Sequence, residues 1–143
     1  MTVNQISVFL ENKPGTLLGL TETLAAHNIN MRALSLADTA DFGIARIIID
    51  NADNAVTLLR ENNYIVKATP VLAFEIADEA GSLHKILALL EKSGQNIEYM
   101  YGFTGLKTNR AYMIVRATDA MAAEKALADA GIHLISQNEL GNI

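Results

Sequence analysis

Short runs of alternating apolar and polar residues, separated by stretches of helical spacing, extend along the whole chain. In residues 3–10 the apolar positions alternate toward the end of the run, which predicts a strand with one face on a core. Leu17, Leu20 and Leu24 then recur at i, i+3 and i+7, which predicts an amphipathic helix ending near residues 27–28. The other elements expected in this half are strands over 29–36, 44–50 and 64–68, a polar turn over 38–43, and a helix capped by Asn51.

The same order of elements recurs in the second half. Leu72, Phe74 and Ile76 predict a strand, and a leucine and isoleucine stripe over residues 83–90 predicts a helix. The remaining expected elements are strands over 96–103, 110–117 and 132–135, a turn over 105–109, and a helix that is capped by Thr118 or Asp119. Gly94 is expected to end the first of these helices in the left-handed conformation, and Gly131 is expected to stop the second.

The chain is therefore predicted to be an internal duplication. Gly15 and Gly81 lie 66 residues apart, whereas Ile29 and Ile97 lie 68 apart, so one small insertion separates the two copies. Each copy has the order βαββαβ, which predicts an α+β fold of two tandem ferredoxin-like domains with antiparallel sheets. The expected domains are residues 1–69 and 70–143, joined at Pro70.

Composition narrows the class of protein. Of the 143 residues, 50% are hydrophobic and 19% charged, so each half can form a small core. The net charge of −5 and the absence of a basic stripe argue against nucleic acid as a partner. The chain has no cysteine, no basic and apolar leader, and no apolar run near the length of a membrane span. We expect a cytoplasmic protein with no membrane contact.

Two equivalent loops are the candidates for ligand binding, because each joins a first strand to a first helix. A helix start offers unpaired N–H groups and the positive end of a dipole, which suit a carboxylate. A glycine there, Gly15 or Gly81, lets a ligand approach the backbone closely. The alternative is that both glycines only permit a sharp turn and that Pro14 favours helix initiation.

The two loops differ in charge. Aligned on the glycines, the first reads Asn12-Lys13-Pro14 and the second Asp78-Glu79-Ala80. Two carboxylates would repel an anionic group and attract an ammonium group, unless they are solvated surface charges. The start of the second strand carries Asn30 in one copy and Glu98 in the other under this alignment.

These features together resemble the ACT domain, a small-molecule-sensing module. The resemblance is carried by Glu11-Asn12-Lys13-Pro14-Gly15 closing the first strand, Thr16-Leu17 opening the helix, and Asn28-Ile29-Asn30 leading into the second strand. Regulatory small subunits of acetolactate synthase carry a similar stretch. The resemblance implies an amino acid bound between paired domains, where the loop of one domain faces the second strand of the other. It implies two sets of contacts: Asn12, Lys13, Pro14, Gly15 and Thr16 with Glu98, and Asp78, Gly81 and Ser82 with Asn30.

No group of residues predicts catalysis. His27, His84 and His133 lack the spacing of a zinc site and a recognisable acid–base companion, so we expect neither metal ligands nor catalytic residues. No phosphate-binding glycine loop follows a strand, and no cofactor is expected. The chain is therefore not expected to be an enzyme.

Apolar residues on both faces of the predicted sheets suggest a further covering layer. Tyr99, Tyr101 and Phe103 share one face of a strand, where packing is favoured over base stacking. Ile44 and Ile48 cannot share a face with the neighbouring isoleucines at 47 and 49, so the helix-free side is also partly apolar. A homodimer is expected to cover it.

The sequence thus predicts a non-catalytic, stand-alone sensor that binds an amino acid between ACT-like domains and regulates amino-acid metabolism. The alternative is a protein-interaction adaptor, or the regulatory subunit of a biosynthetic enzyme, with no ligand bound. A small isolated enzyme is a third and weaker alternative. Calorimetric titration with the amino acids would separate these possibilities.

Overall fold

The computed structural model describes residues 1–38, 40–105 and 107–143, which form two compact units. The first unit comprises residues 4–69, and the second comprises residues 70–143 together with residues 1–3. Residues 1–3 were expected in the first domain, and they group with the second unit. In the described part of the chain, no helix is both long and apolar enough to cross a membrane.

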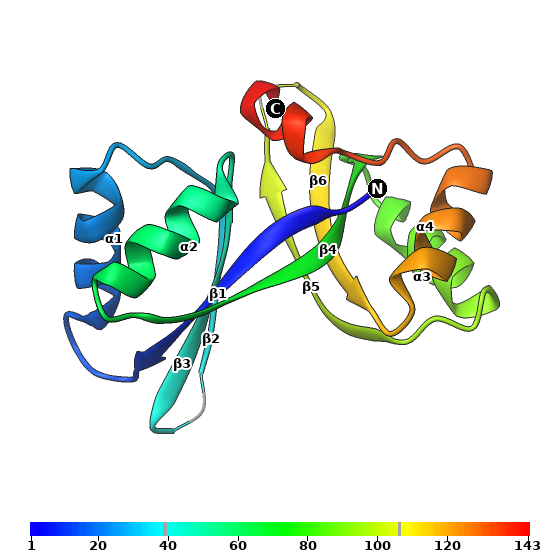
Figure 1. The fold of residues 1–143 in the computed structure, drawn as a ribbon. Coiled ribbons are helices and arrows are strands. Elements are labelled where there is room, and N and C mark those ends of the chain that lie inside the picture. The colour runs from blue at the N-terminus through cyan, green and yellow to red at the C-terminus, as the bar shows by residue number, and fades with distance from the viewer. Residues whose placement is uncertain (39, 106) are drawn as a thin grey trace. The chain divides into compact units, whose positions relative to one another are not determined.

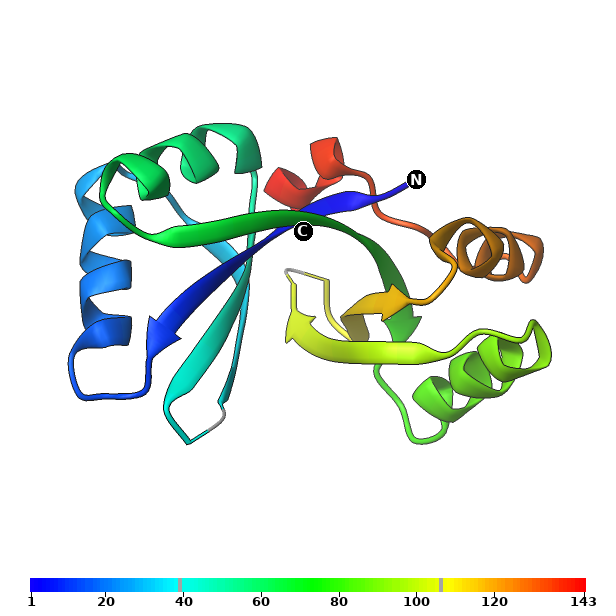
Figure 2. The ribbon, with the colours of Figure 1, turned by 60° about the horizontal axis from the view of Figure 1, so that its bottom comes forward.

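The first unit has the predicted order of elements. They are β1 (Val3–Glu11), α1 (Thr16–Ala26), β2 (Met31–Asp38), β3 (Phe42–Ile49), α2 (Ala52–Glu61) and the first part of β4 (Ile65–Ala77). The strands are ordered β2-β3-β1-β4, and β3 pairs antiparallel with both β1 and β2. Both helices lie on one face of this sheet (Figures 1 and 2). Leu20, Leu24 and Leu59 of the helices are buried there against Ile6 and Ile47 of the strands.

The second unit repeats this arrangement around the rest of β4. Its elements are α3 (Ser82–Lys92), β5 (Ile97–Thr104), β6 (Arg110–Ala117), α4 (Ala120–Asp129) and a 3₁₀ helix, η1 (Gln137–Asn142). The strand order is β4-β6-β5, with antiparallel pairs, and α3 and α4 lie on one face (Figures 1 and 2). Phe74, Leu90 and Leu127 are buried in the core. The predicted α+β fold of two ferredoxin-like βαββαβ repeats is therefore confirmed.

The fourth strand expected over residues 132–135 is reduced to one bridge. Leu134 pairs with Phe74, flanked by bonds from Glu75 N–H to His133 O (3.0 Å) and from Ile135 N–H to Ala73 O (2.8 Å). Pairing stops there because the chain turns into η1, which was not predicted. A capping box between Ser136 and Glu139 begins η1, and Leu140 buries its side chain.

All four long helices end in the same hydrogen-bonding pattern. The residue after each C-cap is left-handed: Asn28 and Asn63 in the first unit, Gly94 and Gly131 in the second, with φ between 55° and 75°. In each case the N–H of the residue after the left-handed one donates to the carbonyl five residues earlier, as from Ile29 N–H to Leu24 O (2.9 Å). This is the Schellman motif. The glycine stops were predicted correctly, and asparagine tolerates the same conformation in the first unit.

The helix starts fall into two classes. Asn51 and Asp119 cap α2 and α4, because their side chains accept hydrogen bonds from first-turn N–H groups. Asn51 was predicted, and of the two candidates for α4 the cap is Asp119. Gly15 and Gly81 precede α1 and α3 instead, both left-handed with φ of 89° and 90°, and neither start has a side-chain cap within the described residues.

The strand register corrects the alignment of the two copies. In each copy the second and third strands pair with a bulge at equivalent places, Met31/Ala33 and Ile97/Tyr99, so the offset is still 66 along β2 and β5. It becomes 68 only past the hairpin, which is two residues longer in the second unit. Asn30 therefore corresponds to Asn96, not to Glu98 as the sequence alignment had it. The mistake arose because Ile29 and Ile97 are alike in type but not in position.

The helix-free face of the second unit is also packed. Phe103 stacks on Tyr112, with ring centroids 5.3 Å apart, which confirms a packing role for one of the three predicted aromatic residues. Tyr112 and its neighbour Ile114 are fully buried. In the first unit, Ile48 is fully buried as well.

Candidate functional site

The β1–α1 loop, residues 11–16, is held in place by hydrogen bonds to backbone carbonyl groups. The Thr16 hydroxyl donates to the carbonyls of Glu11 (2.9 Å) and Lys13 (3.0 Å). Asn12 N–H donates to Asp41 O (2.9 Å), and its side-chain amide reaches Ala40 O (3.4 Å). The loop is therefore held against the β2–β3 hairpin, and the start of α1 is presented in a defined position.

The equivalent loop of the second unit, residues 77–82, joins β4 to α3 and is built in the same way. Asp78 N–H donates to Asn109 O (3.0 Å), which is the counterpart of the bond from Asn12 to Asp41. Ser82 is buried at the first position of α3, where Thr16 stands in α1. The geometry of the loop is thus common to both copies, although the sequences before the glycine differ.

The first loop lines a cavity of about 470 Å³ within the first unit. Its walls include Phe9, Gly15, Thr16, Phe42, Tyr64 and Ile65. Phe42 and Ile65 are 59% and 72% exposed, which is unusual for large apolar side chains in a small domain. A second cavity of about 290 Å³ also includes Asn12, Lys13 and Thr16 in its lining. Four of the five predicted contacts on this loop therefore line cavities, while Pro14 is exposed at the turn.

The equivalent place in the second unit is also hollow, but its walls are charged. This cavity of about 380 Å³ is lined by Glu75, Glu79, Ser82, Lys85, Arg110 and His133. Through the corrected alignment, Glu75, Arg110 and His133 replace Phe9, Phe42 and Ile65. Both copies therefore hold a cavity at this place, and ionisable side chains replace aromatic and aliphatic ones at these three positions.

Glu75 lies at the centre of the charged groups at the cavity of the second unit. Its carboxylate is only 10% exposed and pairs with Lys107 Nζ (3.0 Å) and Arg110 Nε (3.2 Å). The hydrogen bond from Lys107 is the main reason that the pKa of Glu75 lies below its ordinary value. Burial raises the pKa of the adjacent Tyr112, and the negative charge of Glu75 raises it further. This cluster was not predicted from the sequence. The signal was Glu75 itself: in a strand it alternates with Phe74 and Ile76, so its side chain lies on the opposite face of the sheet.

The charge of the first loop is already balanced. Lys13 forms an ion pair with Glu11, and both side chains are largely exposed. Its ammonium group is therefore shared, which lessens its attraction for a ligand carboxylate. The N–H groups of the first turn of α1 are left as the main positive feature of this site.

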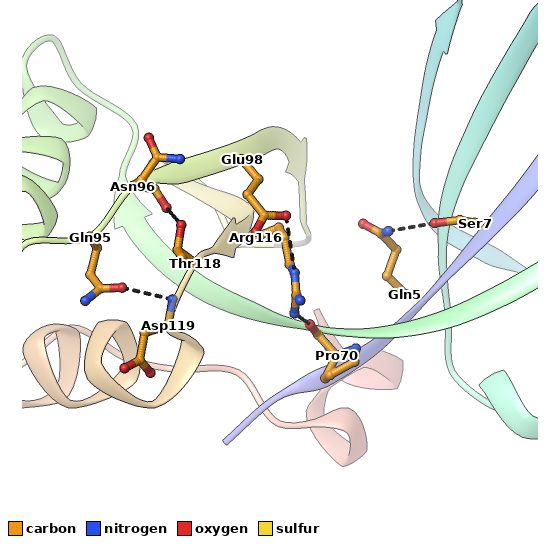
Figure 3. Close-up of polar contacts among 9 residues, drawn as sticks. All are labelled: Gln5, Ser7, Pro70, Gln95, Asn96, Glu98, Arg116, Thr118 and Asp119. Carbon is orange, nitrogen blue, oxygen red and sulfur yellow. Dashed lines mark hydrogen bonds and ion pairs between the residues drawn. The ribbon is translucent and has the colours of Figure 1, made fainter.

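Asn30 and Glu98, expected opposite the loops, lie elsewhere within their own units. Asn30 lines a separate cavity with residues from the end of α1 and the start of α2. Glu98 faces Arg116 at 3.6 Å, and Arg116 donates to Pro70 O at 3.0 Å (Figure 3). That either residue completes a loop of the other domain stays a prediction.

Comparison with known proteins finds a family with the same duplicated architecture. The profile of a family described as an ACT domain pair matches residues 1–143. A crystal structure of a Bacteroides thetaiotaomicron protein superposes with a TM-score of 0.93 at 36% identity, over 100% of this chain and 98% of that one. No curated protein matches the chain.

More distant structures share the fold. The ligand-free regulatory subunit of aspartate kinase from Thermus thermophilus has a TM-score of 0.63 at 19% identity, over 89% of this chain and 91% of that subunit. The corresponding subunit from Thermus flavus has a TM-score of 0.62, also at 19% identity, over 90% and 92% of the two chains. At this identity the similarity is evidence for the fold alone.

Proposed function

Since the chain belongs to the ACT domain family as a tandem pair, we propose that it is a non-catalytic sensor that binds an amino acid and regulates amino-acid metabolism. One observation carries the proposal: each copy holds a cavity beside the loop that precedes its first helix, β1–α1 in one and β4–α3 in the other, and the glycine of that loop is left-handed. Glycine there removes the side chain that would otherwise stand in front of the helix start.

In the first site, the ligand carboxylate binds the uncapped N–H groups at the start of α1, next to Gly15 and Thr16. Asn12, Lys13 and Pro14 shape the loop around it. The ligand side chain enters the cavity against Phe9, Phe42 and Ile65, which favours an apolar amino acid in this copy.

In the second site, Asp78, Gly81 and Ser82 hold the equivalent positions. The ionic walls around Glu75 favour a polar or charged side chain, so the two sites differ in preference. Asn30 and Glu98 are proposed as contributions from the opposing domain, as the family resemblance implies.

The sensor is proposed to act as a homodimer. β2 is an outer strand of the first unit, and it exposes Leu34 and Leu36 by 42% and 49%. An outer strand that carries apolar side chains is suited to pairing with another chain.

A second candidate function is an adaptor that binds a partner enzyme without a ligand. It is favoured by the cavity of the second unit, where Glu75 already forms ion pairs with Lys107 and Arg110. Such a cavity has no need of an amino acid, and the protein would then contribute only its surfaces.

The test is a thermal-shift screen of the twenty L-amino acids, followed by calorimetry. A ligand at about 100 times its dissociation constant adds about 2.7 kcal/mol of stability. We expect one or a few apolar L-amino acids to raise the melting temperature, without effect from the D-forms. If no L-amino acid shifts the transition at millimolar concentration while the protein co-purifies with an enzyme, the adaptor replaces the sensor.

The Gly15→Val variant locates the site, and Gly81→Val is its matched control. Both glycines are left-handed and have open space at the position of a Cβ, so both variants carry the same backbone strain. We expect Gly15→Val to weaken binding of an apolar amino acid at least about tenfold and Gly81→Val to weaken it less. Equal losses, or a larger loss for Gly81→Val, would reject this ranking of the loops.

A further inference from the structure

A third cavity of the first unit, of about 380 Å³, lies where α1 ends and α2 begins. Its lining includes His27, Asn28, Ile29, Asn30, Asn51 and Asn54. None of the residues of the β1–α1 loop belongs to this lining, so the cavity is separate from the loop site of the first unit, although Asn30 is also proposed above to contact the loop of an opposing domain. Four asparagine side chains make it rich in amide donors and acceptors.

The charged group in this lining is already neutralised. Asp50 accepts two hydrogen bonds of 2.8 Å from the guanidinium of Arg32. His27 Nδ1 lies 2.9 Å from Thr23 O. The walls are completed by Ile49 and Leu58, which are apolar. An uncharged polar group suits such a cavity better than an ion, because no free counter-charge faces it.

The second unit shows which group fits the equivalent place. The side chain of Gln95 lies between the end of α3 and the start of α4 (Figure 3). Its Oε1 accepts a hydrogen bond from Asp119 N–H (3.2 Å), and its Nε2 donates to Ser93 O (3.3 Å). One primary carboxamide therefore bridges a backbone donor and a backbone acceptor.

The first unit has the same donor and acceptor but lacks the glutamine. The residues that correspond to Ser93 and Asp119 are His27 and Asn51, and both line the cavity. Ile29 stands in place of Gln95 and has no polar side-chain atom. An apolar residue is common at this position after a Schellman motif, as Ile29 and Ile132 illustrate, so Gln95 is the departure from the rule.

We propose that the cavity beside Ile29 binds a primary carboxamide, with its oxygen on Asn51 N–H and its nitrogen on His27 O. The amide takes the place that Gln95 fills in the second unit. The side chains of free glutamine and asparagine carry this group, and the site is additional to the amino-acid site at the loops.

The test uses propionamide, which has the carboxamide of a glutamine side chain but no amino-acid head group, and propionate as its charged counterpart. In ¹H–¹⁵N spectra of the full chain, we expect propionamide to shift the Asn51 amide in a saturable way and propionate to shift it far less. No saturable shift at Asn51, or equal shifts with propionate, would overturn the proposal. Propionate can also bind a helix start at the loop sites, but Asn51 belongs to neither loop, so the shift of its amide reports on this cavity.

The Ile29→Gln variant gives a second, internal test. The new side chain should fill the cavity as Gln95 does, move the Asn51 resonance in the free protein, and weaken propionamide binding at least about tenfold. Ile29→Leu is the matched control and should keep binding within about twofold. An unchanged propionamide affinity in a folded Ile29→Gln protein would contradict the proposal.

Discussion

At the scale of single residues, Glu75 shows how a carboxylate in place of an aromatic ring alters a site. Its counterpart Phe9 gives the cavity of the first unit an apolar wall, whereas the carboxylate of Glu75 forms ion pairs with Lys107 and Arg110 in the second unit. The carboxylate is nearly buried and its partners are mostly exposed, so the pair is neither an isolated surface contact nor a fully desolvated one.

The Glu75→Gln variant should reveal this arrangement through pH. Folding lowers the pKa of Glu75 from its ordinary value of about 4.5, so its stabilisation is complete above that pH and is lost as the pH falls through the folded value. We expect the variant to lose about 1 kcal/mol at pH 7 and to match the natural protein in strong acid. Urea unfolding at several pH values measures this, and a deficit that persists unchanged at pH 2 would contradict it.

Gly105 and Gly19 should respond in opposite ways to an added methyl group. A Cβ on Gly105 would lie 2.3 Å from Cε2 of Tyr112, whereas one on Gly19 would lie 3.6 Å from the Tyr64 hydroxyl. We expect Gly105→Ala to destabilise the protein by about 1–3 kcal/mol through overpacking. Gly19→Ala should stabilise it by up to about 1 kcal/mol, because alanine favours the helix. Thermal unfolding of both variants decides, and similar shifts of the same sign would refute the prediction.

At the scale of elements, the helix ends carry the clearest signature of duplication. Asn28 and Asn63 hold the backbone conformation that Gly94 and Gly131 hold in the other copy. The bonds that follow are the same in all four, so the motif is preserved although the residue is not. Asparagine can take the place of glycine here because it adopts the left-handed conformation at a lower energetic cost than most other non-glycine residues.

Substitution of Gly131 tests this equivalence. Alanine should cost about 1 kcal/mol or more, because its Cβ opposes a positive φ. Asparagine, which the first unit uses at the matching Asn63, should cost clearly less than alanine. Equilibrium unfolding of Gly131→Ala and Gly131→Asn gives both numbers, and an asparagine variant that is as unstable as the alanine variant would count against the explanation.

Local signals predicted most of these elements, and the failures have local causes. Asn51 and the glycine stops act within one turn, so their effect could be read from the sequence. The strand expected over residues 132–135 is reduced to one bridge at Leu134 because the chain then turns into η1. The corrected alignment needed the register of the hairpins, which depends on hydrogen bonds between strands.

The candidate sites also contain parts that the sequence could predict and parts that it could not. The loop with Gly15 and Thr16 was predictable because a strand, a glycine and a helix follow one another. The cavity walls were not, since Phe9, Phe42 and Ile65 come from three separate strands. Tertiary structure alone brings them together.

At the scale of the molecule, the exposed apolar residues of β2 predict self-association. Light scattering at micromolar concentration should give about twice the monomer mass of 15.5 kDa. Leu36→Lys should shift the mass toward the monomer, because a charge in an apolar contact is costly. Met121→Lys, at an apolar residue that is 81% exposed on α4, should have no effect. A monomeric natural protein would contradict the prediction.

The unequal make-up of the two units also bears on the order in which they form during translation. The first unit draws only on residues 4–69, so it is complete while the ribosome, at about 5–20 residues per second, is still adding the rest. The second unit includes residues 1–3, where Met1 pairs with Glu124, and it needs the late bridge at Leu134. Joining segments so distant in sequence is slow. The two copies of one fold are therefore expected to differ in kinetics, with the first unit folding early from local contacts and the second closing after synthesis has reached its last residues.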